Sequence, residues 1–291
     1  MPPDKGASLY SPMMLRIPLS KHSITVNYAE IRDEANIEVD HLHDCLEICY
    51  CLENTLTVRA GGSSYELSPG NFLLILRGIP HSVINNRDTK NKHFIIDFDF
   101  PNVDEHNEKD HPLAAKVDKL SSLWSAVRGD NRLDDIKLIL GKMERELLDK
   151  NIGWLFLYRG HCLEFLVECI RDVIPPGNDI KHSRETNLAI EILKCIQSNY
   201  NKKMSLSEIA TAMHISVRHA ERVFLDYFGV NYTKMLNLYR IYHTKELLIK
   251  TKLCLDDIAE LVGYSSGQIL NKRFSDIEGI SAREYRAAHK K

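Results

Sequence analysis

No uninterrupted run of apolar residues in this 291-residue sequence approaches the roughly 20 residues that a membrane-spanning helix needs. The first twenty residues also lack a basic segment followed by a long apolar core, so no signal peptide is predicted. The seven cysteines form no CxxC pair and no disulfide-framework spacing, which indicates free thiols in a reducing compartment. These absences predict a cytoplasmic protein without a membrane partner.

The net charge of −2 conceals an uneven distribution of charge along the chain. Residues 181–291 contain 18 Lys and Arg against 12 Asp and Glu, whereas residues 1–180 contain 20 against 28. A basic C-terminal third on an acidic body is expected where only that third meets a polyanion. A solvated surface can carry the same charge, so this pattern needs support from motifs.

Residues 24–100 carry strand signals almost throughout. Short runs rich in β-branched and aromatic residues, such as ITVNY and FIIDFDF, are separated by turn signals such as Pro69-Gly70. Many short strands without intervening helices predict a sandwich or barrel.

Beyond the strand-rich part, the spacing of apolar residues predicts two amphipathic helices at 133–149 and 153–174. Their apolar stripes permit either packing under the barrel or dimerisation. The segment PPGNDIKHSR, residues 175–184, then breaks the pattern and is predicted to be a linker. The stripe of the first helix consists of Ile136, Leu140, Met143 and Leu147.

The last hundred residues contain an internal near-repeat. Residues 205–231 resemble residues 254–281, with Ile209 matching Ile258 at an offset of 49 and Phe224 matching Phe274 at an offset of 50. Each copy carries the signals of a short helix, a turn and a second helix. Duplication of one structural unit is therefore predicted.

Capping and turn residues in each copy agree with a helix-turn-helix unit. Asp256 is expected to cap the first helix of the second copy, and Ser216 the second helix of the first copy. The turn needs a residue that tolerates a positive φ, a role for which Gly263 is well suited and His214 is a tolerable substitute.

The second helix of each copy presents polar residues at spacing i, i+3 and i+4, which brings them to one side of the helix. Arg suits guanine, Gln and Asn suit adenine, and Glu can accept from cytosine in the major groove. One solvated helix face would look the same, but duplication with matching turns favours DNA. The predicted base-reading residues are Arg218, Glu221, Arg222, Gln268, Asn271 and Lys272.

The two units together resemble the DNA-binding domain of the AraC/XylS family of bacterial transcription regulators. The resemblance implies that a helix at 232–250 joins the modules and that both recognition helices enter successive major-groove segments of promoter DNA. Ala282, Thr244 and His214 depart from the family pattern, but no base-facing group is lost. The matching residues are Ile258-Ala259, Val262-Gly263-Tyr264, Phe274, Gly279, Ser281 and Glu284-Tyr285-Arg286.

The same resemblance implies a homodimer, RNA polymerase as a partner, and a small-molecule effector that controls a regulator, often an activator, without enzymatic activity. It also implies phosphate contacts, which position a protein on DNA without specifying sequence. The predicted phosphate contacts are Ser216, Lys234, Arg240 and Arg273.

The strand-rich half resembles a cupin, the small jelly-roll barrel that is common as the sensor of AraC-type regulators. The resemblance is carried by His41-x-His43-x3-Glu47 and by a second motif that ends on His81-x3-Asn85. In metal-binding cupins, such residues supply three histidines and one glutamate to a single divalent ion. The first three share parity and project from one strand face.

Three uses of these four side chains stay open. The regulator context favours the wall of a pocket for a small polar effector, which requires no metal or other cofactor. Contacts that satisfy one another in a tight barrel, or a transition-metal site, are the alternatives. Ala35 and Asn54 stand where metal-binding cupins have glycine, and Leu76 replaces a proline, which opposes a catalytic metal.

The sequence therefore predicts a multi-domain protein with an all-β cupin-like sensor at 1–112 and a helical packing or dimerisation region at 113–174. A linker at 175–184 and an all-α double helix-turn-helix domain at 185–291 follow. The predicted function is sequence-specific regulation of transcription under control of a small polar effector. The alternatives are a metal-dependent cupin enzyme with a helical appendage, and a ligand-independent regulator whose cupin only dimerises.

Overall fold

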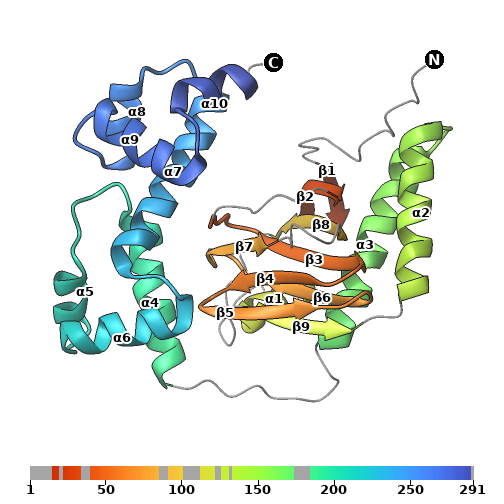
Figure 1. Cartoon of the computed structure of the whole chain (residues 1–291), viewed down its shortest axis with the longest axis horizontal. Coiled ribbons are helices and arrows are strands. Elements are labelled where there is room, and N and C mark those ends of the chain that lie inside the picture. Colours follow the sequence, from red (N-terminus) through yellow and green to blue (C-terminus); the bar gives the residue numbers. More distant parts are fainter. Residues whose placement is uncertain are drawn as a thin grey trace.

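The chain folds into a strand-rich N-terminal domain and an all-helical C-terminal domain, which lie side by side (Figure 1). This arrangement confirms the predicted fold class. The predicted linker lies outside the described residues, apart from Arg184. The computed structural model describes residues 15–19, 22–33, 40–84, 91–100, 112–121, 126–130, 133–173 and 184–289.

Two antiparallel sheets form the N-terminal domain, in the orders β1-β2-β8-β3-β6-β9 and β5-β4-β7. The large sheet takes in β9, which lies beyond residue 112, where the barrel was predicted to end; β9 pairs with β6 through partners such as Leu73 and Arg128. The strands are β1 (Leu15–Leu19), β2 (His22–Arg32), β3 (Leu46–Glu53), β4 (Leu56–Ala60), β5 (Ser63–Leu67), β6 (Asn71–Ile75), β7 (His81–Ile84), β8 (Lys92–Asp99) and β9 (Ala126–Asp130).

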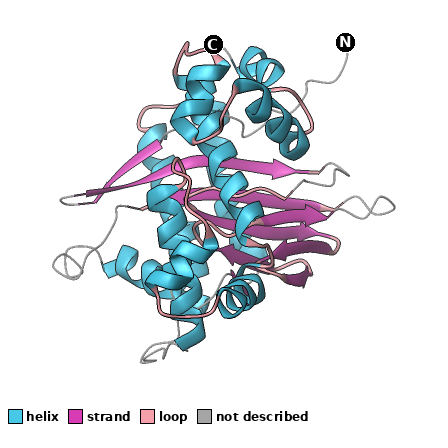
Figure 2. Ribbon diagram, turned by 90° about the vertical axis from the view of Figure 1, so that its left-hand side faces the viewer, coloured by secondary structure: helices cyan, strands magenta, loops and turns pink. Residues whose placement is uncertain are grey.

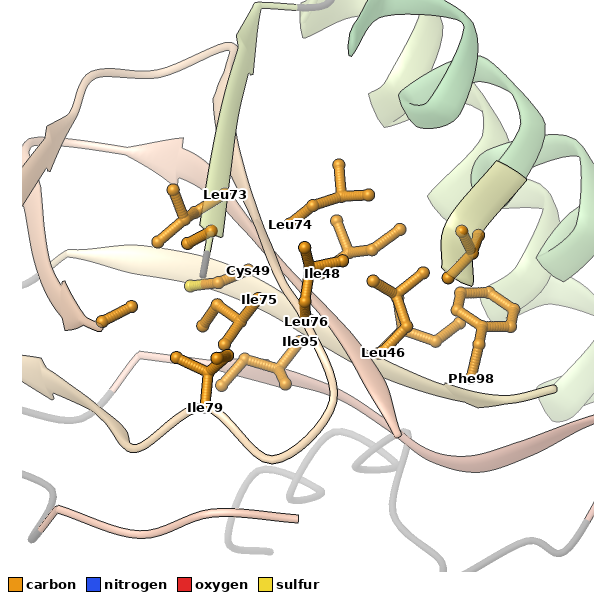
Figure 3. Close-up of a cluster of buried hydrophobic side chains, with 14 of the residues drawn as sticks. Leu46, Ile48, Cys49, Leu73, Leu74, Ile75, Leu76, Ile79, Ile95 and Phe98 are labelled. Atoms are coloured by element: carbon orange, nitrogen blue, oxygen red, sulfur yellow. The ribbon is translucent and has the colours of Figure 1, made fainter. Parts of the chain in front are cut away.

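Strand β3 lies at the centre of this domain, between β8 and β6, and both of its faces are buried. Leu46 pairs with Phe98 of β8, and Figure 3 shows these two side chains in contact within a cluster of buried apolar residues. Tyr50 packs against Phe165, with ring centroids 6.0 Å apart. One face of β3 therefore packs outward against a helix, which leaves the face that carries Glu47 inside the barrel.

Three helices belong to this region: α1 (Pro112–Ser121) precedes β9, and α2 (Leu133–Asp149) and α3 (Trp154–Val173) follow it. Figure 1 shows α2 and α3 on the side of the sheets opposite the C-terminal domain. Ile136, Leu140 and Met143 of the predicted stripe are buried. The stripe therefore serves intradomain packing, and any dimer must use a different face.

The C-terminal domain contains two helix-turn-helix modules joined by α7, whose bounds match the predicted linking helix. Figure 2 shows these helices in front of the strands. Phe224 belongs to a core that continues into the sensor, whereas Leu270 and Phe274 belong to a separate second core. The helices are α4 (Arg184–Asn199), α5 (Leu206–Ala212), α6 (Val217–Phe228), α7 (Tyr232–Lys250), α8 (Leu255–Val262), α9 (Gly267–Glu278) and α10 (Ala282–His289).

Local sequence signals account for the modules' turns. His214 adopts φ 55° and Gly263 φ 89°, as both turns require. Ser216 caps α6 as predicted. The prediction for α8 was wrong: Cys254 occupies the N-cap position and Asp256 lies in the first turn, because the Cys254 Sγ accepts the Asp257 N–H at 3.4 Å. Across the part of the chain that is described, no helix is long and apolar enough to cross a membrane.

Candidate functional site

Helix α6 presents the predicted base-reading residues on its exposed face. Arg218, Glu221 and Arg222 are all exposed. Their spacing places them on one side of the helix because a residue lies close to those three and four positions away. The opposite side is buried in the module and consists of Ala220, Val223, Phe224 and Phe228.

Arg222 is engaged by acidic residues of its own domain. Its guanidinium donates to Glu185 Oε1 at 2.9 Å and to Asp226 Oδ2 at 3.3 Å. The three side chains are exposed, at 52% for Arg222, 61% for Glu185 and 63% for Asp226. Exposed ion pairs contribute little to stability, so a DNA base or phosphate can compete for this arginine.

Helix α9 presents two of its three predicted base-reading residues at the surface. Gln268 and Lys272 are exposed, but Asn271 is half-buried and its Oδ1 accepts the Ala282 N–H at 3.1 Å. The Asn271 side chain is thus turned toward α10. Ile269, which was not predicted, is 45% exposed on α9 and offers an apolar contact for a thymine methyl group. The sequence signal that could have identified Ile269 was an apolar residue at a position of the helix outside the spacing of its buried core residues.

Two of the predicted phosphate contacts have other partners in this structure. Arg240 donates to the backbone carbonyls of Tyr200 at 2.7 Å and Lys202 at 3.1 Å, so it ties α7 to the loop between α4 and α5. Lys234 donates to Asp40 of the sensor at 2.7 Å.

The other two predicted phosphate contacts lie at the surface of the recognition helices. Ser216 is exposed at the N-terminus of α6, where its Oγ accepts the His219 N–H at 3.2 Å. Arg273 is exposed on α9 and lies 3.7 Å from Asp276 Oδ2. Both positions suit contacts with the DNA phosphate backbone beside a recognition helix.

In the sensor, the structure brings His41, His43, Glu47 and His81 into one cluster. One potential ligand atom from each lies within 4.8 Å of those of the other three. The ring centroids of His41 and His81 are 4.3 Å apart, and those of His43 and His81 are 4.9 Å apart. Glu47 and His81 are buried, so the cluster faces the barrel interior.

The surroundings of His81 define which of its ring nitrogens faces Glu47. Its Nδ1 lies 2.8 Å from the Ile79 carbonyl oxygen, which can only accept, so Nδ1 carries the proton. Its Nε2 is buried and lies 3.4 Å from Glu47 Oε2, so it faces the carboxylate. An imidazole nitrogen and a carboxylate oxygen that face each other in a buried site are stabilised by a proton or a metal cation between them.

His43 neutralises Glu47 from the other side. Its Nε2 lies 2.9 Å from Glu47 Oε2, and its Nδ1 lies 3.1 Å from Cys45 Sγ. Burial acts to lower the pKa of His43, but the acidic groups of Cys45 and Asp97 outweigh it and hold that pKa well above its usual range. Burial acts to raise the pKa of Glu47, but His81 and His43 hold it well below its usual range.

Asp97 of β8 is a further acid beside the cluster, which the sequence analysis missed. It pairs with Glu47 in the register of β3 and β8, and burial, reinforced by the Glu47 carboxylate, raises its pKa to about 7. With His43 and Cys45 it forms a second group whose ligand atoms lie within 4.8 Å of one another. The sequence signal that could have identified Asp97 was an acidic residue inside the barrel, within the strand run FIIDFDF.

The chemistry of the four-residue cluster fits a divalent transition metal. Imidazole nitrogens and a carboxylate oxygen bind such ions at about 2.0–2.2 Å, which requires ligand atoms no more than about 4.2 Å apart. The observed spread of 4.8 Å therefore needs only a small adjustment of the rings. His41, His43, Glu47 and His81 would hold the ion, and the Ile79 carbonyl would orient His81.

Comparisons with known proteins agree with this architecture. Residues 209–288 match the family described as a helix-turn-helix domain, and residues 28–96 match the family described as a cupin domain. The lactose operon transcription activator of Staphylococcus xylosus is 33% identical over 91 residues, which is 31% of this chain and 33% of that protein. The match thus spans about a third of that relative.

Two other similar proteins are covered nearly throughout. The virulence regulon transcriptional activator VirF of Shigella flexneri is 22% identical over 275 residues, 89% of this chain and 97% of that protein. The crystal structure of ToxT from Vibrio cholerae O395, bound to (E)-4-(8-methylnaphthalen-1-yl)but-3-enoic acid, has a TM-score of 0.52. It is 13% identical and covers 91% of this chain and 98% of that chain, which shows a common fold.

Proposed function

Because this chain belongs to the AraC family of transcription regulators and carries a cupin domain, we propose that it binds specific promoter sequences through α6 and α9. The observation that carries the proposal is the duplication. Each module presents a second helix with exposed Arg, Gln or Lys over a buried core. The similar proteins are regulators, which favours this function over a metal-dependent enzyme.

Selection of binding sites from random DNA, followed by footprinting, tests this function. The expected site has two elements about one helical turn, or about 34 Å, apart on one face of the duplex. Arg218→Ala should relax base preference in one element and Gln268→Ala in the other. Arg171→Ala is the control, because Arg171 is exposed on α3 and pairs with Glu168. Binding of all sequences with equal affinity would contradict the proposal.

We further propose that the protein acts in the cytoplasm as a homodimer that contacts RNA polymerase. The dimer is assigned to an apolar patch at one end of α2 and α3, on the side away from the C-terminal domain. Clustered apolar side chains at this exposure are typical of protein interfaces. The patch consists of Leu148, Ile152, Phe156 and Leu157, which are 57%, 104%, 76% and 51% exposed.

For the sensor, we propose that the effector is a divalent transition-metal ion bound by the four-residue cluster. The buried Nε2 of His81, 3.4 Å from the Glu47 carboxylate within the four-residue cluster, supports an ion rather than a larger molecule. ToxT binds a carboxylic acid. In this chain, the Glu47 carboxylate would repel such an acid, and Asp97 adds a second carboxyl group.

Metal binding is tested on protein purified without a His-tag, by elemental analysis and by titration with Zn²⁺, Ni²⁺, Mn²⁺ and Fe²⁺. His81→Gln should weaken binding by about 100-fold or more, since changes outside the ligand shell alone weaken it by about 10–100-fold. His161→Gln is the control, because His161 lies on α3 and pairs with Glu164. Absence of stoichiometric binding would leave a small polar molecule as the effector.

A further inference from the structure

An ion pair joins the sensor to the first helix-turn-helix module. Lys234 Nζ donates to Asp40 Oδ2 at 2.7 Å, across 194 positions of sequence. Lys234 lies in the first turn of α7, where its own N–H is capped by Asn231 Oδ1. Figure 1 shows α6 and α7 on the side of the sensor where the β4–β5 hairpin ends.

Asp40 is held in place from within the sensor. Ser82 Oγ donates to Asp40 Oδ1 at 2.9 Å, so both carboxylate oxygens are engaged, and Arg59 lies 4.0 Å away. Burial acts to raise the pKa of Asp40, but the hydrogen bonds from Lys234 and Ser82 outweigh it and lower that pKa. The carboxylate is therefore ionised at neutral pH and attracts Lys234.

Asp40 also adjoins the four-residue cluster. His41 and His81 exchange backbone hydrogen bonds of 3.0 and 2.9 Å, and Asp40 and Ser82 are the next opposed pair. Successive side chains on paired strands point to opposite faces. The rings of His41 and His81 thus point into the cluster, while Asp40 and Ser82 point toward α7. One pair of backbone hydrogen bonds connects the two sites.

A lysine ammonium that is bound to a carboxylate cannot bind a DNA phosphate at the same time. We infer that Asp40 binds Lys234 in place of a DNA phosphate, so that docking of the sensor against α7 and binding of DNA compete for this lysine. A metal ion held by His41 and His81 then weakens the docking of the sensor against α7. The inference rests on the proposed DNA binding and the proposed metal site.

Electrostatics gives the direction of the effect of the ion. A divalent cation carries two charges and displaces the single proton of the His43 imidazolium, so its binding adds net positive charge on the opposite side of the His41–His81 bridge from Asp40. That charge attracts the Asp40 carboxylate and repels the Lys234 ammonium, and such effects extend over about 8 Å at physiological salt. Metal binding is therefore expected to free Lys234 and to strengthen the binding of DNA.

The competition is tested with the full chain, stripped of metal with EDTA, on a DNA site obtained by the selection described above. Asp40→Asn should bind this DNA about 2- to 5-fold more tightly, the range expected for release of one partly exposed ion pair. It should also steepen the slope of log affinity against log salt by about 0.9, for one additional phosphate contact. The double variant with Lys234→Gln should match Lys234→Gln alone.

The matched control is Asp44→Asn. Asp44 carries the same charge on the same segment and lies near α7, where burial first and the Asp44 carboxylate second raise the pKa of Tyr239. The partner of Lys234, however, is Asp40. Asp40→Ser is a second variant, and thermal unfolding verifies that each variant is folded. Equal affinity and equal salt slope for wild type and Asp40→Asn would overturn the inference while leaving the proposed DNA binding in place.

The metal arm uses ZnCl₂ as the probe. Zinc should strengthen DNA binding by wild type about as much as Asp40→Asn does, and should add nothing further to Asp40→Asn. Zinc that binds to wild type without changing its affinity for DNA would overturn the link between the cluster and Asp40. An equal zinc-induced increase in DNA affinity for wild type and Asp40→Asn would overturn it as well. Failure of wild type to bind any selected site would overturn the proposed function and the inference together.

Discussion

The backbone of Gly62, at the turn between β4 and β5, lies directly against the backbone of Gly229, at the end of α6. A Cβ atom at Gly62 would lie 2.9 Å from Gly229 Cα, and Gly62 has a φ of 76°. The sensor and the first module therefore touch through main-chain atoms, and no side chain at this point can move aside. The close approach depends on the absence of a side chain from both residues.

Gly62→Ala should separate the two domains, because the new methyl group cannot be accommodated against the α6 terminus. Small-angle X-ray scattering should show an increased radius of gyration. Gly279→Ala is the matched control, since Gly279 has a φ of 73° and nothing lies within 4 Å of its added Cβ. Both variants carry a similar backbone penalty of about 1 kcal/mol. An equal radius of gyration for both would contradict the role of the Gly62 contact.

Gln268 and Asn271 should behave differently, although both are amides on α9. Gln268→Ala should relax one base preference by about 1–3 kcal/mol, because an exposed amide can read adenine. Asn271→Ala should leave base preference unchanged and lower the free energy of unfolding by about 1 kcal/mol, since the Ala282 N–H loses its acceptor. Competition with single-base variants of the DNA site and urea unfolding separate the two effects. A changed base preference in Asn271→Ala would assign it a reading role after all.

Arg222→Ala should weaken binding to the selected site by about 1–3 kcal/mol and relax one base position. Glu185→Gln should have a small opposite effect, because it releases the Arg222 guanidinium from its 2.9 Å ion pair. Titration calorimetry on the selected site and on random DNA measures both changes. Losses of equal size on the two DNAs would assign Arg222 to the phosphate backbone instead.

The stability of the metal-free protein should depend on pH through Asp97. Burial raises the pKa of this carboxyl group to about 7, from about 4 in the unfolded chain. The folded state binds the proton more tightly, so this group lowers the free energy of unfolding as pH rises from about 4 to about 7. Asp97→Asn, which does not titrate, should gain about 1–3 kcal/mol relative to wild type between pH 5 and pH 8. Urea unfolding at both pH values measures this gain; a constant difference would show that Asp97 does not titrate in this range.

Charge placed in the apolar patch should prevent dimerisation. Phe156→Glu puts a carboxylate on a side chain that is 76% exposed, so it should leave the monomer fold intact while opposing burial in an interface. Ile249→Glu is the control, because Ile249 is 50% exposed on α7, outside the patch. Sedimentation at micromolar concentration should show a dimer for wild type and the control and a monomer for Phe156→Glu. A monomeric wild type, with and without DNA, would contradict the homodimer.

Much of the C-terminal domain could be predicted because its signals are local. Helix periodicity, the Ser216 cap and the positive φ at His214 and Gly263 depend on residues a few positions apart. The second helix-turn-helix module repeats the same local signals. The bounds of α7, which joins the two modules, therefore follow from the ends of the modules on either side of it. The strand-rich character of the sensor is local in the same sense. The prediction that His41 and His43 share one strand with Glu47 was wrong, because β3 begins at Leu46 and the segment before it brings both histidines to Glu47.

Contacts between distant segments were decided by the tertiary structure alone. Strand β9 joined the large sheet, Asn271 turned toward Ala282, and Asp97 came to lie opposite Glu47. Lys234 met Asp40 across the domain boundary. The physical reason is that side-chain periodicity places a residue on a face of its own element, whereas the partner of that face depends on register, packing and domain docking. By itself, the sequence determined the two domains and their candidate residues, and the tertiary structure decided which of those residues meet.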